Sequence, residues 1–401
     1  MSIALILCIG IFLFLILNNN YLDQGSADVS GAFDAPGVSE NEILIGTSNA
    51  LTGHASFLGT QTMHGAISYI NHVNDNGGVH GKNITLISYD DQYDPPQTIA
   101  NTKKLIEEDE VFALFSYVGT PTSVVAKPIL EEAGVPLVGL FTGASVFRDP
   151  ASPYIFNIRA SYYQEIQEVI SHLVEELNMK KIAVFYQNDA YGLDGLKSAE
   201  DILKGYDLTP ASTGSFERGT LEIEDALKSI KSASPEAVIM IGTYSPCAKF
   251  IKLAKKEGLN ALFHNVSFVG AEALKEELGE SGEGVIITQV VPPPIDEIPL
   301  PAIVEYQELL AQYFPSDKPD FVGLEGYLNA KVLVKALEDS GKNLTRESFI
   351  NALNNLNDFS VGIGSNISFS ESDHQGLDEV YATQIRDGEL IFFSSWKELT
   401  W

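Results

Sequence analysis

The sequence has little cysteine and little positive charge. Cys8 and Cys247 are its two cysteines, so neither a disulfide framework nor a CxxC metal site can be built from it. The 25 Lys and Arg residues stand against 54 Asp and Glu residues, which gives a formal net charge of −29. Nucleic acid and anionic membrane surfaces are therefore poor partners, because their charge would repel this chain.

The sequence also lacks the common signatures of enzymes. It contains no GxGxxG after an expected strand, no GxxxxGK[ST], no GxSxG and no HExxH. The acidic stretch at 90–94 lacks EF-hand spacing, and the histidines at 64, 72 and 80 do not share one helix. We therefore expect a protein that is not an enzyme and that holds neither a metal nor a cofactor.

The longest apolar run lies at the N-terminus. Residues Ile3–Leu17 are almost all Ile, Leu and Phe, and no Lys or Arg precedes them. The run is shorter than the usual membrane span of about 20 residues and has the length of a signal-peptide core. We predict a signal peptide or N-terminal membrane anchor at 1–20, followed by a polar linker at 21–40.

The stretch Val111–Gly143 shows the organisation of the rest of the chain. Val111–Ser116 is an apolar run typical of a buried parallel strand. Thr120-Pro121 favours a helix start, Gly134 favours its end, and Val135–Leu140 predicts the next strand. Such alternation runs from residue 43 to 140 and begins again after 159, with strands expected at 181–186, 212–216, 237–242, 264–269 and 284–291. This order predicts an α/β protein with two doubly wound parallel sheets.

Polar residues follow two expected strands of that stretch. They lie at Tyr117–Thr120 and Phe141–Gly143, and each group offers a hydroxyl. In open α/β sheets, ligands bind beyond the carboxyl ends of the strands, and a helix N-terminus there favours an anion. The alternative is an ordinary strand–helix–strand unit whose loops are merely polar.

Several motifs in order carry a family resemblance. They are ILIGTSNALTGHASFLG (43–59), INHVNDNGGVHGKNITL (70–86), YDDQYDP (89–95), AVFYQNDAYG (183–192), LEGYLNA (324–330) and FSESDHQGLDEVY (369–381). From about Glu42 to the C-terminus, the chain resembles the extracytoplasmic solute-binding proteins of ABC transporters, of the branched-chain amino-acid (Leu/Ile/Val) type. The same fold also serves receptor ligand-binding domains and amide sensors.

The resemblance implies two lobes joined by three crossovers, near Arg159, Gln289 and Gly362. The first lobe would comprise 41–159 and 290–361, and the second 160–289 and 362–401. A ligand would bind between the lobes, which would close on it by a hinge motion.

The resemblance also implies which positions contact a ligand. They are Leu58, Val118, Gly119, Thr120, Phe141, Thr142, Gly143, Tyr162, Tyr191, Tyr244, Ser267, Phe268 and Glu325. Backbone N–H groups at 118–120 and 141–143, with the hydroxyls of Thr120 and Thr142, would hold a ligand carboxylate. The tyrosines would stack on the body of the ligand.

One position departs from the family pattern. Amino-acid binders of this type place an acidic residue where this chain has Ser267-Phe268. An ammonium group left unpaired in a desolvated site is costly. A free amino acid is therefore in question unless Glu272 or Glu325 supplies the charge, and an aromatic or other carboxylate fits as well.

These features predict a monomeric protein that captures a small organic ligand outside the cytoplasmic membrane. It would deliver the ligand to the membrane permease of an ABC transporter and contact the membrane only through its N-terminal segment. Its location would be the periplasm or the outer face of the cytoplasmic membrane. The alternative is a membrane-tethered sensor domain of the same fold.

Overall fold

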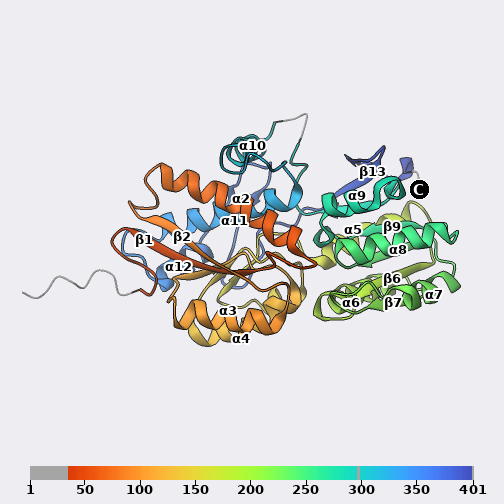
Figure 1. The fold of residues 1–401 in the computed structure, drawn as a ribbon, viewed down its shortest axis with the longest axis horizontal. Helices are drawn as coiled ribbons and strands as arrows, with labels where there is room; N and C mark the ends of the chain where they lie inside the picture. Colours follow the sequence, from red (N-terminus) through yellow and green to blue (C-terminus); the bar gives the residue numbers. More distant parts are fainter. Residues whose placement is uncertain (1–34, 296–298, 400–401) are drawn as a thin grey trace, which may run out of the picture. The chain divides into compact units, whose positions relative to one another are not determined.

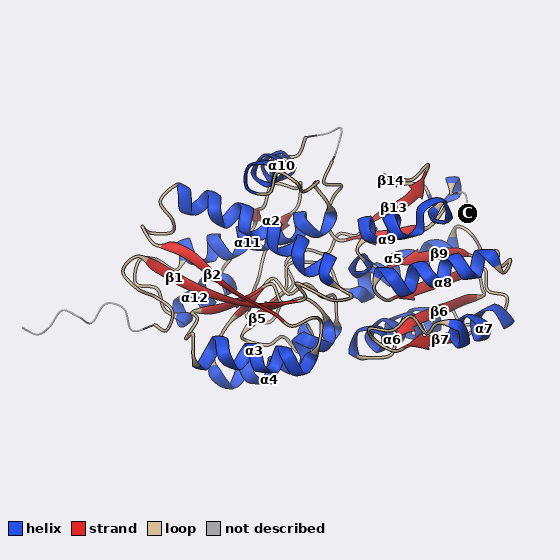
Figure 2. Ribbon diagram, in the orientation of Figure 1, coloured by secondary structure: helices blue, strands red, loops and turns tan. Residues whose placement is uncertain are grey.

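The computed structural model of the chain describes residues 35–295 and 299–399. The predicted signal or anchor segment at 1–20 lies outside the described residues, as does most of the predicted linker. Among the helices that are described, none is both long and apolar enough to cross a membrane. The described chain forms two mostly parallel sheets with helices packed on them, which confirms the predicted α/β fold of two lobes (Figures 1 and 2).

The first lobe is built on a five-stranded parallel sheet. Its strands are ordered β2-β1-β3-β4-β5, with bounds β1 (Glu42–Asn49), β2 (Asn83–Asp90), β3 (Ala113–Phe115), β4 (Leu137–Val138) and β5 (Ile155–Phe156). Figure 1 shows helices on both sides of this sheet, as its doubly wound order requires. They are α2 (Ser56–Asp75), α3 (Pro95–Glu107), α4 (Thr120–Ala133), α10 (Pro301–Tyr313), α11 (Phe321–Asp339) and α12 (Arg346–Asn354).

The second lobe is built on a seven-stranded sheet ordered β14-β13-β10-β9-β8-β6-β7. The strands are β6 (Ile182–Gln187), β7 (Thr213–Phe216), β8 (Ala237–Ile241), β9 (Leu262–Asn265), β10 (Ile286–Gln289), β13 (Tyr381–Arg386) and β14 (Glu389–Phe392). Strands β13 and β14 pair antiparallel, so this sheet is mixed at one edge. The helices are α5 (Tyr162–Glu175), α6 (Ala190–Gly205), α7 (Glu224–Ser232), α8 (Tyr244–Lys256) and α9 (Ala271–Leu278).

Local sequence signals explain where several helices begin and end. Helix α4 starts at Thr120 with Pro121 in its first turn, and it ends at Gly134, which has a left-handed φ of 61°. Both ends were expected from the sequence, because Pro suits the first turn of a helix and Gly the residue after the last turn. Helix α5 begins with a capping box in which the Ser161 side chain accepts a hydrogen bond from the N–H of Gln164.

The prediction of a strand at 264–269 is wrong for the second half of that segment. Strand β9 ends at Asn265, and Ser267–Val269 form a short 3₁₀ turn that leads into α9, a helix not predicted from the sequence. The N–H of Ser267 donates to a Glu165 carboxylate oxygen at 2.7 Å and not to a neighbouring strand. A contact 102 residues away therefore ends this strand, and an apolar run cannot reveal such a contact.

The chain passes between the lobes three times. It leaves the first sheet after β5, returns after β10, and crosses again before β13. The segment after the small hairpin β11 (Phe359–Ser360) and β12 (Asn366–Ile367) still contacts the first lobe. The Phe369 ring lies 5.5 Å from that of Phe156, and the N–H of Leu377 donates to the carbonyl of Ile158. We therefore propose that the third crossover follows Leu377 and does not lie near Gly362.

Candidate functional site

The two loops singled out in the sequence meet at the carboxyl edge of the first sheet. Val118 and Phe141, which follow β3 and β4, form an isolated parallel bridge. This pairing places the Thr120 and Thr142 hydroxyl oxygens 2.7 Å apart, where they share a hydrogen bond. The Thr142 hydroxyl also donates to the Tyr162 hydroxyl at 3.4 Å.

Gly119 lets a tyrosine pack onto the first of these loops. Its φ of 101° lies in a region that favours glycine, and a Cβ built on it would lie 2.0 Å from a carbon of the Tyr93 ring. The side chain of Tyr93 is fully buried. Tyr93 was not predicted as a site residue, although its motif YDDQYDP was noted.

Five buried rings form an aromatic cluster with Phe268 at its centre. The Phe268 ring centroid lies 4.8 Å from that of Tyr191, 5.7 Å from Phe141, 6.0 Å from Tyr93 and 6.4 Å from Tyr162. Phe141 and Tyr93 belong to the first lobe, whereas Tyr162, Tyr191 and Phe268 belong to the second. The cluster therefore joins the lobes, and Phe268 packs against Phe141, Tyr162 and Tyr191, three rings that the family resemblance assigns to a ligand site.

The other predicted positions lie around this cluster, except for one. Gly143 packs against Tyr162, since a Cβ on Gly143 would lie 2.5 Å from the Tyr162 backbone nitrogen. Leu58 is buried and faces Gly270, where a Cβ would lie 2.9 Å from a Leu58 methyl carbon. Tyr244 is not part of the aromatic cluster. It is half-buried at the start of α8, with its ring 6.3 Å from that of Phe57.

An ionic cluster of Arg159, Glu165, Ser267 and Glu325 lies beside the rings. The Arg159 side chain is only 1% exposed, and its Cζ lies 5.1 Å from the Phe141 ring centroid. Arg159 Nη2 donates to Glu165 Oε1 at 3.3 Å and to Ser267 Oγ. Glu165 Oε2 accepts hydrogen bonds from the Ser267 N–H at 2.7 Å and from the Thr288 hydroxyl at 2.6 Å.

Glu325 is held less firmly than Glu165. Its Oε1 lies 3.4 Å from Arg159 Nη1 as an ion pair without a hydrogen bond. Burial raises the pKa of Glu325 to about 7, although the positive charge of Arg159 opposes this rise. Burial lowers the pKa of Arg159, but Glu325 and Glu165 outweigh that effect and raise it, so Arg159 stays charged.

Several buried polar atoms near the two clusters have no hydrogen-bond partner within the described chain. They are Arg159 Nε, Arg159 Nη1, Glu325 Oε1 and Tyr191 Oη. A buried donor or acceptor left unpaired costs about 1–3 kcal/mol. Because these atoms come from both lobes, a small polar ligand between the lobes would satisfy groups that the protein leaves open.

Two hollows in the described chain are bordered by residues outside the aromatic and ionic clusters. One of about 560 Å³ lies between the lobes and is bordered by α2, α9 and the start of α11. Its wall includes Glu272, whose Oε1 accepts the Phe321 N–H at 3.2 Å while Oε2 has no partner. Burial raises the pKa of Glu272 to about 7.

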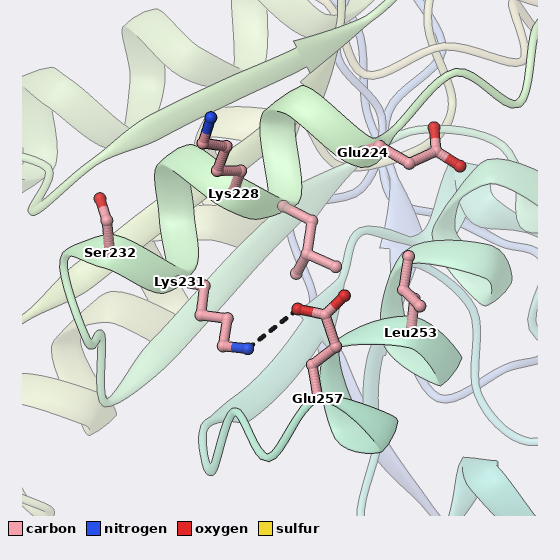
Figure 3. A pocket seen from close by; sticks show the side chains of 7 residues that line it. Glu224, Lys228, Lys231, Ser232, Leu253 and Glu257 are labelled. Atoms are coloured by element: carbon pink, nitrogen blue, oxygen red, sulfur yellow. Dashed lines mark hydrogen bonds and ion pairs between the residues drawn. The ribbon is translucent and has the colours of Figure 1, made fainter.

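The other hollow lies on the surface between α7 and α8 (Figure 3). It measures about 540 Å³, and two of its charged side chains, Lys231 and Glu257, form an ion pair at 2.9 Å. None of the predicted site residues borders it. It has no buried polar atom that lacks a partner among the described residues.

The sequence prediction missed Arg159 and Glu165 as site residues. Arg159 was noted only as the position of a crossover. A charged residue at the end of the otherwise uncharged segment Ile155–Arg159 is a signal that could have drawn attention to it. Glu165 gave no such signal, because a glutamate in the first turn of a helix is common for dipole reasons alone.

Comparison with known proteins agrees with this architecture. The family model described as periplasmic binding protein matches residues 42–389. The "Leu/Ile/Val-binding protein homolog 7" of Brucella abortus (strain 2308) is 24% identical over 371 residues, which cover 87% of this chain and 90% of that protein.

Two solved structures extend the comparison. A possible leucine/isoleucine/valine-binding protein from Rhodopirellula baltica SH 1 is 35% identical with a TM-score of 0.84, covering 91% of this chain and 100% of that one. A branched chain amino acid ABC transporter protein from Thermus thermophilus with bound valine shares the fold, with 20% identity, a TM-score of 0.80 and coverage of 89% and 96%. These relatives are binding proteins and not enzymes. The chain therefore belongs to the periplasmic binding protein family, as a solute-binding protein of the Leu/Ile/Val type.

Proposed function

We propose that this protein captures a small organic ligand, an amino acid or an aromatic or other carboxylate, outside the cytoplasmic membrane. It passes the ligand to the permease of an ABC transporter. The protein acts by closing its two lobes on the ligand and makes or breaks no bond. It works as a monomer in the periplasm or at the outer face of the membrane, with the N-terminal segment as its signal peptide or anchor.

One observation carries this proposal. Unpartnered buried polar atoms from both lobes, including Arg159 Nη1 and Tyr191 Oη, lie next to aromatic rings from both lobes. A ligand that reaches these groups contacts the two lobes at once, so it binds the closed arrangement better than an open one. A ligand shifts a conformational equilibrium by this difference in affinity.

The ligand class follows from the charges around this site. Ser267 replaces the acid that amino-acid binders of this type provide, so an α-ammonium group would need Glu325 or Glu272 instead. Glu325 is already paired with Arg159, whereas Glu272 has a free oxygen but borders the separate hollow next to α9. The names of the relatives favour branched-chain amino acids, and the site itself favours a carboxylate.

Calorimetric titration combined with small-angle X-ray scattering tests the proposal. Amino acids, aromatic and aliphatic carboxylates, and neutral amides are titrated in turn into the purified protein. A ligand with a Kd in the micromolar range or below, whose binding reduces the radius of gyration, supports capture by lobe closure. Tight binding without any change in the radius of gyration would contradict the hinge. A related sensor would bind equally well, so co-purification with an ABC permease tests the transport role.

A further inference from the structure

We propose that Arg159 binds the anionic group of the ligand, and that the ligand is a carboxylate with an apolar body and no ammonium group beside the carboxylate. This inference rests on the function proposed above and narrows the ligand class that it names. It assigns the recognition of charge to a residue that the sequence marks only as the position of a crossover.

The hydrogen bonds of Arg159 are the first part of the argument. A guanidinium has five N–H donors and no acceptor. Here Nη2 donates hydrogen bonds to Glu165 and Ser267, whereas Nε and Nη1 donate to no atom in the described chain. The side chain is 1% exposed, so water does not readily take their place. A ligand carboxylate would therefore gain charge-assisted hydrogen bonds from donors that give up no existing hydrogen bond.

The two threonines that were expected to bind the carboxylate, in contrast, already have hydrogen-bond partners. Thr120 and Thr142 already share a 2.7 Å hydrogen bond, and the Thr142 hydroxyl also accepts the N–H of Ala144 at 3.2 Å. Either hydroxyl would have to exchange a partner in order to bind a ligand. Their net gain is therefore smaller than that of Arg159.

The carboxylates near Arg159 do not form a suitable ammonium site. Both oxygens of Glu165 accept hydrogen bonds, from Ser267, Thr288 and Arg159 itself. Glu325 has a free oxygen, but it lies 3.4 Å from the Arg159 guanidinium. An ammonium group at this point would meet a fixed positive charge, which disfavours it in a site without water.

Glu325 occupies the position in which a ligand carboxylate would pair with Arg159. Its carboxylate faces Arg159 Nη1 without forming a hydrogen bond, and burial favours its protonated form. A ligand carboxylate that pairs with Arg159 would let Glu325 take up a proton, so the site would exchange one carboxylate for another without adding net charge.

The aromatic cluster defines the rest of the ligand. The Phe141 and Tyr162 ring centroids lie 5.1 and 5.7 Å from Arg159 Cζ, so both rings pack against the guanidinium. The cluster extends from these rings to Phe268, which is fully buried. A ligand body next to Arg159 therefore contacts rings or takes the place of Phe268, and either outcome requires an apolar body.

Matched pairs of compounds test the ligand class. 4-Methylpentanoate is compared with L-leucine and 4-methylpentanamide, and 3-phenylpropionate with L-phenylalanine and 3-phenylpropanamide, by calorimetry at pH 6 and pH 8. We expect at least one acid to bind about 10- to 100-fold more tightly than both its amino acid and its amide, as charge-assisted hydrogen bonds imply. We also expect tighter acid binding at pH 6, where Glu325 takes up its proton more easily. The charged groups that act on Glu325 are Arg159 and Arg148, which oppose its protonation, and Glu165, which favours it.

Two variants test the residues. Arg159→Lys keeps the positive charge but removes the donors at Nε and Nη1, so it should weaken acid binding about tenfold or more. Glu325→Gln removes the competing carboxylate at constant shape, so it should tighten acid binding and abolish its preference for pH 6. Arg346→Lys is the matched control, because Arg346 donates to the carbonyls of Val111 and Phe112 outside both clusters. Circular dichroism melts confirm that each variant is folded.

The outcomes separate this inference from the proposed function. Amino acids that bind as tightly as their acids would overturn the inference and leave solute capture intact. Acid binding that is unchanged in a folded Arg159→Lys variant would also overturn it. If no acid, amino acid or amide binds, both the inference and the proposed function fail as stated.

Discussion

The Nη1 atom of Arg159 lies 3.4 Å from Oε1 of Glu325, with both side chains buried. Arg159 follows the last strand of the first sheet, and Glu325 lies in α11, 166 positions later in the chain. The same guanidinium reaches Glu165 in α5 and Ser267 after β9, so one positive charge contacts elements of both lobes. Breaking a buried pair by removing one partner is costly, because the other charge stays buried.

The first prediction concerns the pH dependence of stability. The pKa of Glu325 is raised in the folded protein to about 7 from its ordinary value of 4.5. Between these values the unfolded chain releases a proton that the folded chain keeps, so stability falls as pH rises from about 4.5 to about 7. Glu325→Gln should remove part of this fall, on the order of 1–3 kcal/mol between pH 5 and pH 8.

Urea unfolding at pH 5 and pH 8 measures this effect. Glu272 and Asp91 also have raised pKa values, about 7 and about 6, and contribute falls of the same sign. Only the difference between the wild type and the variant therefore reports on Glu325. Glu276→Gln serves as a control, because Glu276 is exposed on α9. Equal pH dependence in the wild type and Glu325→Gln would show that Glu325 ionises normally in the folded state.

The second prediction concerns Phe268. Removing a buried aromatic ring typically costs about 3–5 kcal/mol, so Phe268→Ala should lower the free energy of unfolding by about that amount. Phe250→Ala is the matched control, since Phe250 is equally buried in the second lobe, against Phe185 at 4.3 Å. Both variants should lose stability to a similar extent.

The two variants should differ in ligand binding. Phe268→Ala enlarges the space between Phe141 and Tyr191, so a bulkier acid such as naphthaleneacetate should gain affinity relative to 4-methylpentanoate. The Phe250→Ala variant should keep the wild-type order of affinities, because its cavity lies outside the aromatic cluster. Competition calorimetry with the two acids gives this ratio. The same order in both variants would mean that Phe268 does not limit the size of the ligand.

The fold could be predicted largely from local signals. Thr120-Pro121 and Gly134 bound α4 as expected, since they act through the backbone of their own turn. The loops after β3 and β4 could be placed together, because parallel strands end at the same edge of a sheet. The division into two lobes was predicted from the resemblance to a known family.

The centre of the candidate site could not be predicted in this way. The Arg159 guanidinium donates a hydrogen bond to Ser267, which lies 108 positions later in the chain. The N–H of Ser267 in turn donates to Glu165 at the point where β9 ends. Phe268 was expected to line a space that its ring occupies. Only the packing of the two lobes reveals these relationships, because neither the period of apolar residues nor any turn signal encodes them.

The third prediction concerns the hydrogen bond between Thr120 and Thr142. Removing one of the two hydroxyls leaves the other without this hydrogen bond. Replacing both threonines with valine keeps the shape of the side chains and leaves no unpaired group from this contact. The free-energy costs of Thr120→Val and Thr142→Val should therefore sum to more than that of the double variant, by about 0.5–1.5 kcal/mol.

A double-mutant cycle by urea unfolding measures this coupling. In carboxylate titrations, the double variant should lose less affinity than Arg159→Lys, because the hydroxyls bond to each other. A larger loss in the double variant would place the carboxylate at the threonines, as the family resemblance suggested. Additive stability costs would show that the 2.7 Å hydrogen bond does not form in solution.

The last prediction compares two glycines with nearly the same positive φ angle. Gly119 and Gly77 have φ values of 101° and 100°, so alanine is strained at both. A Cβ on Gly77 would meet no atom within 4 Å, whereas a Cβ on Gly119 would lie 2.0 Å from the Tyr93 ring. Gly77→Ala should cost about 1–2 kcal/mol for the backbone alone. Gly119→Ala should cost more, and the excess measures how firmly Tyr93 is held.

Urea unfolding and ligand titration of both variants distinguish two ways in which the molecule can respond. If Tyr93 moves, the aromatic cluster loses one of the two first-lobe rings packed against Phe268, and Gly119→Ala should weaken ligand binding, whereas Gly77→Ala should not. If the loop moves and Tyr93 stays, the bridge between Val118 and Phe141 is strained, and stability falls with little change in affinity. Equal stability of the two alanine variants would show that Tyr93 does not pack on Gly119 in solution, and the aromatic cluster would then lack the support of this loop.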